Sequence, residues 1–182
     1  IATRLHARGI APDPDAIHAA REALARHLAE AHEALLAGIF DEMRSEGDYV
    51  PDTAGSARRA LRLAALQLLS RIDGGERAEV LFGIAGNMTE RMGALAALVR
   101  QDRAETALAA LEDEFKDNRL VMDKWFAVQV MAAPPARAVA VARKLAERAD
   151  FDWRNPNRFR ALLGALSANH AAFHAADGSG YD

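Results

Sequence analysis

Residues 120–149 read LVMDKWFAVQVMAAPPARAVAVARKLAERA and contain two helical patterns separated by a pair of prolines. Apolar residues recur every three or four positions on either side of Pro134 and Pro135, which matches the period of an α-helix. A proline lacks the backbone N–H that a helix interior needs, so one helix ends before the next begins. The stretch therefore predicts a helical hairpin. Its apolar stripes are Val121, Trp125, Val128 and Ala132, then Val139, Ala142, Leu145 and Ala149.

The same period extends toward the N-terminus. Asp13, Pro14 and Asp15 suit the start of a long amphipathic helix, because Asp is a good N-cap and proline fits the first turn. Turn-forming residues over positions 45–55 then predict a loop before a second stripe begins. The first stripe is Ile17, Ala20, Leu24, Leu28, Ala31, Leu35 and Ile39, and the second is Leu61, Ala65, Leu68 and Ile72.

Capping residues mark further helix starts. Asn87 or Thr89 can cap the next helix, and Asp102 with Glu105 three residues later has the spacing of a capping box. Asn155, which is followed by proline, predicts another start. Six or more segments thus have helical period, and no stretch alternates with period two for long enough to indicate a strand.

Short connections between these segments make neighbouring helices antiparallel. We therefore expect residues 1–182 to form a single all-α domain, a superhelical array of antiparallel helix hairpins of the HEAT or armadillo kind. Because the chain starts at Ile1 instead of methionine and stops soon after Gly178, we expect this domain to be truncated at both ends relative to a longer parent protein.

Composition disfavours several classes of function. Apolar residues make up 51% and charged residues 27%, which is typical of a globular chain. Cysteine is absent, so disulfides, thiolate ligands and thiol nucleophiles are excluded. The formal net charge of −3 gives no reason to expect a nucleic-acid partner. No apolar run approaches the roughly 20 residues that cross a bilayer, and we expect a cytoplasmic location without membrane association.

Histidine spacing gives one candidate metal site. His170 and His174 are four residues apart and would share a helical face, as in helical zinc sites. No glutamate lies between them, and a site needs a third ligand and supporting groups. We therefore expect surface or hydrogen-bonded histidines. His27 and His32 are five residues apart and do not share a face.

Three other polar motifs favour structural roles. The sequence Gly178-Ser179-Gly180 lacks the G-x-S-x-G spacing of a nucleophile elbow and predicts a tight turn. The acidic run at residues 112–114 is typical of a solvated helix face. The run DKWF at residues 123–126 either anchors a partner or, as we favour, packs in the core beside a satisfied ion pair.

The segment from Asn155 to Arg160 contains more hydrogen-bonding groups than a helix start requires, since one cap is enough. Asn157 and Arg158 follow the cap, and Arg160 comes two positions later. Two residues this far apart on a helix point in different directions, so we expect at most one of the arginines to face a common ligand.

Three motifs resemble, in order and spacing, the C-terminal helical domain of the bacterial aminopeptidase N family. Shorter similarities near the N-terminus extend the resemblance over nearly the whole chain. The three motifs are LVMDKWF at residues 120–126, NPNR at 155–158, and AAFH at 171–174 followed by DGSGY at 177–181; the shorter ones are DPDAI at 13–17, REAL at 21–24 and NMT at 87–89.

This family consists of gluzincin zinc metallopeptidases, in which an H-E-x-x-H motif and a downstream glutamate hold the metal and a G-A-M-E-N motif binds the substrate's amino terminus. None of these motifs occurs in this chain. The resemblance implies a parent enzyme that removes N-terminal amino acids from peptides with the help of zinc. It also implies that this chain contains no catalytic residue and no zinc ligand.

In the family, the helical domain closes over the catalytic domain and encloses the cavity. The implied partners are therefore the catalytic domain of the same polypeptide and a peptide substrate inside the cavity. We expect Arg158 or Arg160 to face this cavity and contact the substrate's carbonyls or carboxyl end, with Asn157 as a third lining residue. The order of helices alone equally allows an alternative, a free-standing adaptor that binds a peptide or protein on a concave face.

Overall fold

The computed structural model describes residues 1–44, 47 and 49–181, and the regular structure within these ranges is helical. None of the described helices combines the length and the apolar character that crossing a membrane requires. In chain order the helices are α1 (Ala2–His6), α2 (Pro14–Ala31), α3 (Glu33–Glu42), α4 (Thr53–Leu69), α5 (Glu76–Ile84), α6 (Met88–Arg100), α7 (Glu105–Phe115), α8 (Arg119–Met131), α9 (Pro135–Ala146), α10 (Pro156–Phe159), the π-helix η1 (Arg160–Gly164), α11 (Ala165–Ala168) and α12 (His170–Phe173).

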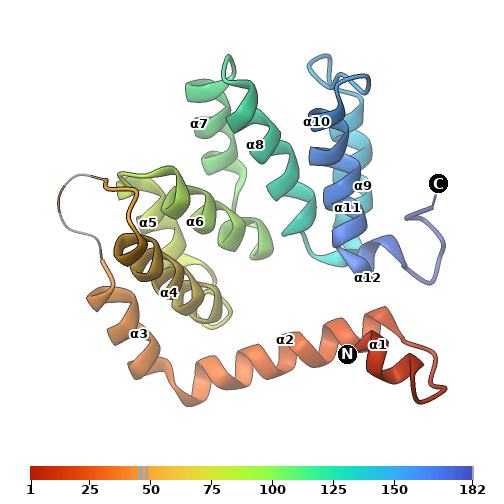
Figure 1. Ribbon diagram of the computed structural model, residues 1–182, viewed down its shortest axis with the longest axis horizontal. Helices are drawn as coiled ribbons and strands as arrows, with labels where there is room; N and C mark the ends of the chain where they lie inside the picture. The colour runs from red at the N-terminus through yellow and green to blue at the C-terminus, as the bar shows by residue number, and fades with distance from the viewer. Residues whose placement is uncertain (45–46, 48, 182) are drawn as a thin grey trace.

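The helices from α3 onward form successive hairpins (Figure 1). Helix α3 packs on α4, α5 on α6 and α7 on α8, and the second helices of these hairpins contact one another from α4 through α6 to α8. Helix α9 and the α10–η1–α11 segment form the last hairpin, and α12 packs against α9. The predicted all-α array of antiparallel hairpins is confirmed. We refer to α3–α12 as the array.

Side-chain caps fix several of the predicted helix starts. Asp13 caps α2 by accepting a hydrogen bond from the backbone N–H of Ala16 at 3.0 Å. Of the two candidates for α6, Asn87 is the cap, and it accepts from the backbone N–H of Glu90 at 2.9 Å. Asn155 caps α10, with proline in the first helical position as expected. Each cap satisfies a donor that the first helical turn would otherwise leave unpaired.

Two local predictions are wrong. Asp102 and Glu105 do not form a capping box: Asp102 has a φ of 59° and pairs with Arg137, and α7 begins after Ala104 without a side-chain cap. The single long helix predicted from Ile17 is divided into α2 and α3 at His32, whose φ of −127° and ψ of 25° lie outside the helical region.

The loop predicted over residues 45–55 includes positions 45, 46 and 48, which lie outside the described residues. Helix α4 begins at Thr53, within the predicted loop. Its N-cap is Asp52, which accepts from the backbone N–H of Gly55 at 2.7 Å. Gly55 therefore belongs to the first turn of the helix.

One cluster of buried apolar residues runs through the hairpins from α3 to α12. Trp125 and Phe126 belong to it, with their rings edge to face at 5.3 Å, so the core interpretation is confirmed for the two aromatic residues of the run, whereas Lys124 is exposed. Burying one large aliphatic side chain contributes roughly 1.5–3 kcal/mol, so this cluster is the main source of stability. Its largest fully buried side chains include Leu66, Leu69, Leu81, Leu95, Leu98, Leu111, Phe126 and Leu162.

The segment from α10 to α11 is one helical rod with a π-helical turn, η1, in its middle. A π-turn takes in an extra residue because its hydrogen bonds span five positions instead of four. Arg158 and Leu162 are buried on either side of Arg160, which is exposed. The change of helix type therefore falls within the segment that contains the predicted cavity-lining residues.

Helix α2 is packed differently from the array. It runs beneath the hairpins, in contact with α3 and α4 at one end and α12 at the other (Figure 1). Of its 18 residues only Ala29 is buried, while Leu24 and Leu28 of its apolar stripe are 59% and 39% exposed. The helix therefore bridges the two ends of the array without being absorbed into the core.

Candidate functional site

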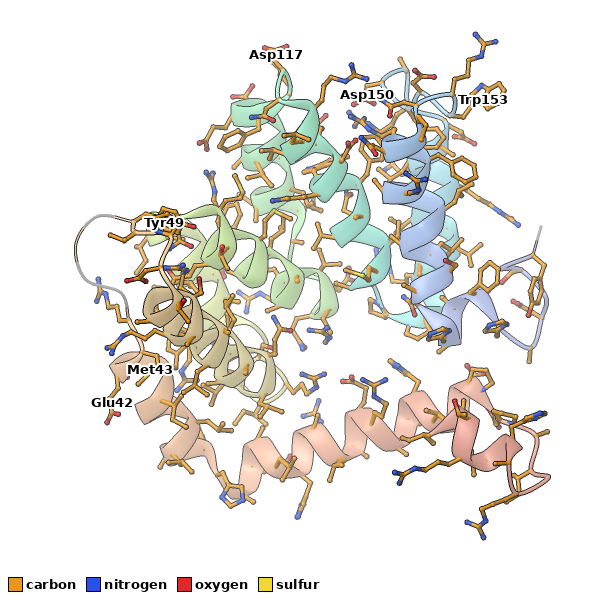
Figure 2. The ribbon with its side chains drawn as sticks, viewed as in Figure 1. Glu42, Met43, Tyr49, Asp117, Asp150 and Trp153 are labelled. Atoms are coloured by element: carbon orange, nitrogen blue, oxygen red, sulfur yellow. The ribbon has the colours of Figure 1, made fainter. Side chains whose placement is uncertain are left out.

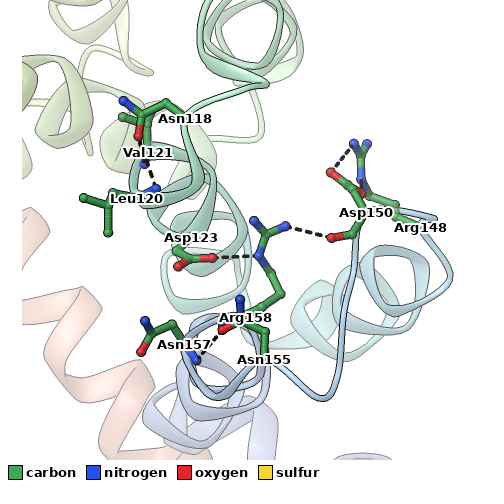
Figure 3. Close-up of polar contacts among 9 residues, drawn as sticks. All are labelled: Asn118, Leu120, Val121, Asp123, Arg148, Asp150, Asn155, Asn157 and Arg158. Atoms are coloured by element: carbon green, nitrogen blue, oxygen red, sulfur yellow. Dashed lines mark hydrogen bonds and ion pairs between the residues drawn. The ribbon is translucent and has the colours of Figure 1, made fainter.

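The first candidate site is the polar cluster around Arg158 (Figure 3). Arg158 donates from Nε to Oδ1 of Asp123 at 2.7 Å and from Nη1 to the carbonyl oxygen of Asp150 at 3.0 Å. Its guanidinium lies 4.4 Å from the ring centroid of Phe126, and the residue is 7% exposed. Arg158 thus ties α8, the loop before α10 and α10 together. The ion pair expected near Trp125 forms with this distant arginine and not with the adjacent Lys124.

Arg148 extends this cluster toward α7. It donates from Nε to Oδ1 of Asp150 at 2.8 Å and from Nη2 to Oε1 of Glu112 at 2.5 Å. The hydrogen bond between Arg148 and Asp150 lowers the pKa of Asp150 and raises the pKa of Arg148, so both groups stay charged. Acid–base chemistry requires neighbouring groups whose pKa values are driven toward neutrality. The pair of Arg148 and Asp150 instead favours the charged forms, which suits a structural ion pair.

The three predicted cavity-lining residues have different environments. Arg158 is buried and ion-paired, whereas Asn157 and Arg160 are exposed. Trp153, on the loop before α10, projects away from the array (Figure 2) and is 65% exposed, and Phe159 is 44% exposed. The available surface at this end of the array therefore contains Arg160 and two aromatic side chains. Whether any of these residues faces a substrate stays a prediction.

The acidic run at residues 112–114 is paired as well as solvated. Its three carboxylates face different basic side chains, Arg148, Lys116 and Arg91 in sequence order. The hydrogen bond from Arg91 lowers the pKa of Glu114. Such pairs at the surface add little to stability.

The stretch at Gly178-Ser179-Gly180 forms the predicted tight turn. Gly178 has a φ of 77°, which favours glycine, and the backbone N–H of Ser179 donates to Oδ1 of Asp177 at 2.9 Å. A Cβ at Gly180 would lie 2.2 Å from the carbonyl oxygen of Phe173, so only glycine fits this close approach. The turn packs the chain back onto α12.

His170 and His174 share a face, as their spacing predicts, with parallel rings whose centroids are 6.2 Å apart. Nδ1 of His174 is hydrogen-bonded to the hydroxyl of Tyr181. Within the described ranges, no group of three or more His, Cys, Asp or Glu residues is placed to hold a metal ion. Protein zinc sites use at least three side-chain ligands, of which these two histidines could supply two.

A second candidate site, which the sequence did not reveal, is a cleft of about 1220 Å³ between α2 and the array. We call it the α2 cleft. Arg71 donates from Nε and Nη2 to the two carboxylate oxygens of Glu22, both at 2.8 Å, which lowers the pKa of Glu22. These residues are 49 positions apart, so no local spacing could have indicated the pair. The cleft is lined on one side by Ile17, His18 and Glu22 and on the other by Arg71, Arg100 and Ala133.

Comparison with known proteins extends the resemblance seen in the sequence. The family model described as "Domain of unknown function (DUF3458_C) ARM repeats" matches residues 1–182. Aminopeptidase N of Escherichia coli (strain K12) is 41% identical over 179 residues, and those of Caulobacter vibrioides and Haemophilus influenzae are 38% and 34% identical over 177 residues each. These alignments cover 93–94% of this chain but 20% of each relative, so the chain spans about a fifth of their length.

A solved structure shares the fold. In the crystal structure of Legionella pneumophila aminopeptidase A in complex with aspartic acid, the matching region superimposes with a TM-score of 0.83 at 27% sequence identity. The match covers 93% of this chain and 21% of that one. The resemblance to the aminopeptidase N family, read from three sequence motifs, is therefore confirmed.

Proposed function

Since the chain belongs to the family described as DUF3458_C ARM repeats, we propose that it is the helical domain that caps the active-site cavity of a zinc-dependent aminopeptidase. The parent enzyme removes N-terminal amino acids from peptides, and this domain encloses the bound peptide without supplying catalytic groups. The observation that carries the proposal is the similarity of almost the entire chain to one fifth of three proteins named aminopeptidase N.

The proposed partner of this chain is the catalytic domain of the same polypeptide, to which we assign the zinc. Zinc with an open coordination position polarises carbonyl groups and lowers the pKa of bound water. The continuous core from α3 to α12 suits the role assigned to this chain, because a well-packed array presents a rigid wall to a cavity.

Within this proposal, Arg160 or Arg158 contacts the carbonyl or carboxyl groups of the substrate, with Asn157 beside them. Arg160 is the stronger candidate, because it is exposed whereas Arg158 is already paired with Asp123. Removing a contact made equally to bound substrate and transition state raises KM without changing kcat.

The Arg160→Gln variant of the parent enzyme should therefore show a raised KM for a tripeptide and a nearly unchanged kcat. Arg154→Gln is the matched control, because Arg154 is also an exposed arginine and lies in the loop just before α10. Unchanged kinetics in a variant that combines Arg158→Gln and Arg160→Gln would contradict the contact.

The larger proposal is tested with an aminoacyl reporter substrate. We expect zinc-dependent turnover by the parent polypeptide and none by residues 1–182 alone. Turnover by the isolated chain, or a parent without aminopeptidase activity, would refute the assignment. A natural gene product that binds peptides and lacks a peptidase portion would instead support the adaptor. The expected cytoplasmic location stays a prediction, which cell fractionation tests.

A further inference from the structure

The α2 cleft has an excess of positive charge, although the chain has a formal net charge of −3. Among the described residues that line it, four are arginines and only Glu22 is acidic. Arg21 and Arg26 belong to α2, while Arg71 and Arg100 lie on the opposite wall, at the ends of α4 and α6. Side chains from α2 and from the array project toward each other across this region (Figure 2). The cleft therefore favours an anionic occupant.

Gln67 on α4 orients the two arginines of the array wall. Its backbone carbonyl accepts from Nη1 of Arg71, and its side-chain Oε1 accepts from Nη1 of Arg100. The side-chain amide of Gln67 is itself held, because Nε2 donates to the carbonyl oxygen of Gly93 at 3.0 Å. Both guanidinium groups are thus positioned before a ligand arrives, which reduces the entropy lost on binding.

The two arginines differ in what they already bind. Arg71 has a two-point contact with the carboxylate of Glu22, whereas Arg100 forms no ion pair within the part of the chain that the structure describes. Burial and the nearby charge of Arg71 lower the pKa of Arg100, and the charge of Glu22 offsets only part of this effect. An added carboxylate beside Arg100 would form charge-assisted hydrogen bonds, which are the strong ones in proteins.

The remaining lining indicates what else the occupant contains. Ile17 of α2 and Met131, Ala133, Pro134 and Ala171 of the array supply apolar surface. A lone inorganic anion would leave this surface and most of the 1220 Å³ uncovered. A peptide end combines a carboxylate with backbone groups and aliphatic side chains, so it matches both parts of the lining.

We propose that the α2 cleft binds the carboxyl terminus of a peptide, with Arg100 as the main contact for the carboxylate and Arg71 shared between the ligand and Glu22. The cleft lies at the C-terminal end of α8, whereas Asp123 and Arg158 meet near its N-terminal end. This site is therefore separate from the contact assigned to Arg160, and peptide binding here does not depend on peptidase activity.

Calorimetric titration of the full chain with N-acetyl-trialanine and with its C-terminal amide tests the proposal on the unaltered protein. The two probes differ only in the terminal carboxylate. We expect the amide to bind at least about tenfold more weakly, because it loses hydrogen bonds between charged groups. Equal affinity for acid and amide would overturn the proposal. Acetate that binds as tightly as the peptide would show a site for small free carboxylates and would also overturn it.

Two variants locate the contact. Arg100→Gln should weaken binding of N-acetyl-trialanine by about tenfold or more, whereas Glu22→Gln should strengthen it because Arg71 is released. Arg103→Gln is the matched control, since Arg103 pairs with Glu79 outside the cleft. Affinity that is unchanged by Arg100→Gln, or lowered equally by the control, would place the peptide elsewhere and refute the assignment.

Discussion

The helices of the array and helix α2 have similar amphipathic sequences, but the apolar faces of the array helices are buried, whereas that of α2 is largely exposed. In α6, six of 13 residues are buried, whereas in α2 only one of 18 is buried. Periodicity determines which face of a helix is apolar, but the neighbouring elements determine whether that face leaves water. Hydrophobic stabilisation follows the apolar area removed from water. Leucines at equivalent positions of the apolar stripe should therefore contribute very different amounts to the free energy of unfolding in the two regions.

The largest effect is expected inside the array, at the ion pair between Arg62 and Glu90. Nη1 of Arg62 lies 2.6 Å from Oε1 of Glu90, and the two side chains are 6% and 5% exposed. Glu90→Ala would leave a buried, uncompensated guanidinium, so we expect a loss of about 3–5 kcal/mol in the free energy of unfolding. Urea denaturation measures it. Glu79→Ala, in an exposed pair with Arg103, is the control, and equal losses in both variants would contradict the prediction.

The next effect concerns packing in the array. Leu98 of α6 is 1% exposed, and Leu98→Ala should lower the free energy of unfolding by about 2–5 kcal/mol, because it removes buried contacts and leaves a cavity. Thermal and urea unfolding should show the same loss. A loss below about 1 kcal/mol would mean that the array is less tightly packed than its buried leucines indicate.

A smaller effect is expected where α2 meets the array. Glu22 is 37% exposed, so Glu22→Gln should change global stability by roughly 0–1 kcal/mol while increasing hydrogen exchange in α2. Arg71 lowers the pKa of Glu22 below its ordinary 4.5, so the pair stabilises the fold above about that pH and is lost as pH falls through the folded-state pKa. Acid should therefore lower the protection of α2 amides, measured relative to their intrinsic exchange rates at the same pH, in the unaltered chain, and the variant should lack this step.

The smallest effect is expected on the exposed stripe of α2. Leu24 is 59% exposed, so Leu24→Ala should change the free energy of unfolding of this chain by no more than about 0.5 kcal/mol. Urea denaturation beside Leu98→Ala gives the direct comparison. A cost close to that of Leu98→Ala would show that α2 packs more deeply in solution and would remove the contrast between the two regions.

The same contrast explains how much could be predicted from sequence. Helices, hairpins and most caps follow from local signals, such as Asn155 before a proline. The break between α2 and α3 at His32 could not be predicted in this way, because no proline or glycine lies beside it. Arg158 was predicted to line a cavity, but the sequence did not predict its pairing with Asp123, which lies 35 positions away, because local patterns do not encode such pairs. The α2 cleft was missed for the same reason, because its charged groups converge only after the array has folded.

The π-helical turn η1 has a consequence for the orientation of the residues around it. One residue of an α-helix corresponds to about 100° of rotation, so an additional residue offsets the two halves of the rod by a comparable angle. Arg158, before the turn, points toward Asp123, and Leu166, after it, is buried in the core. The rod thus makes a polar attachment on one side of the irregular turn and an apolar one on the other.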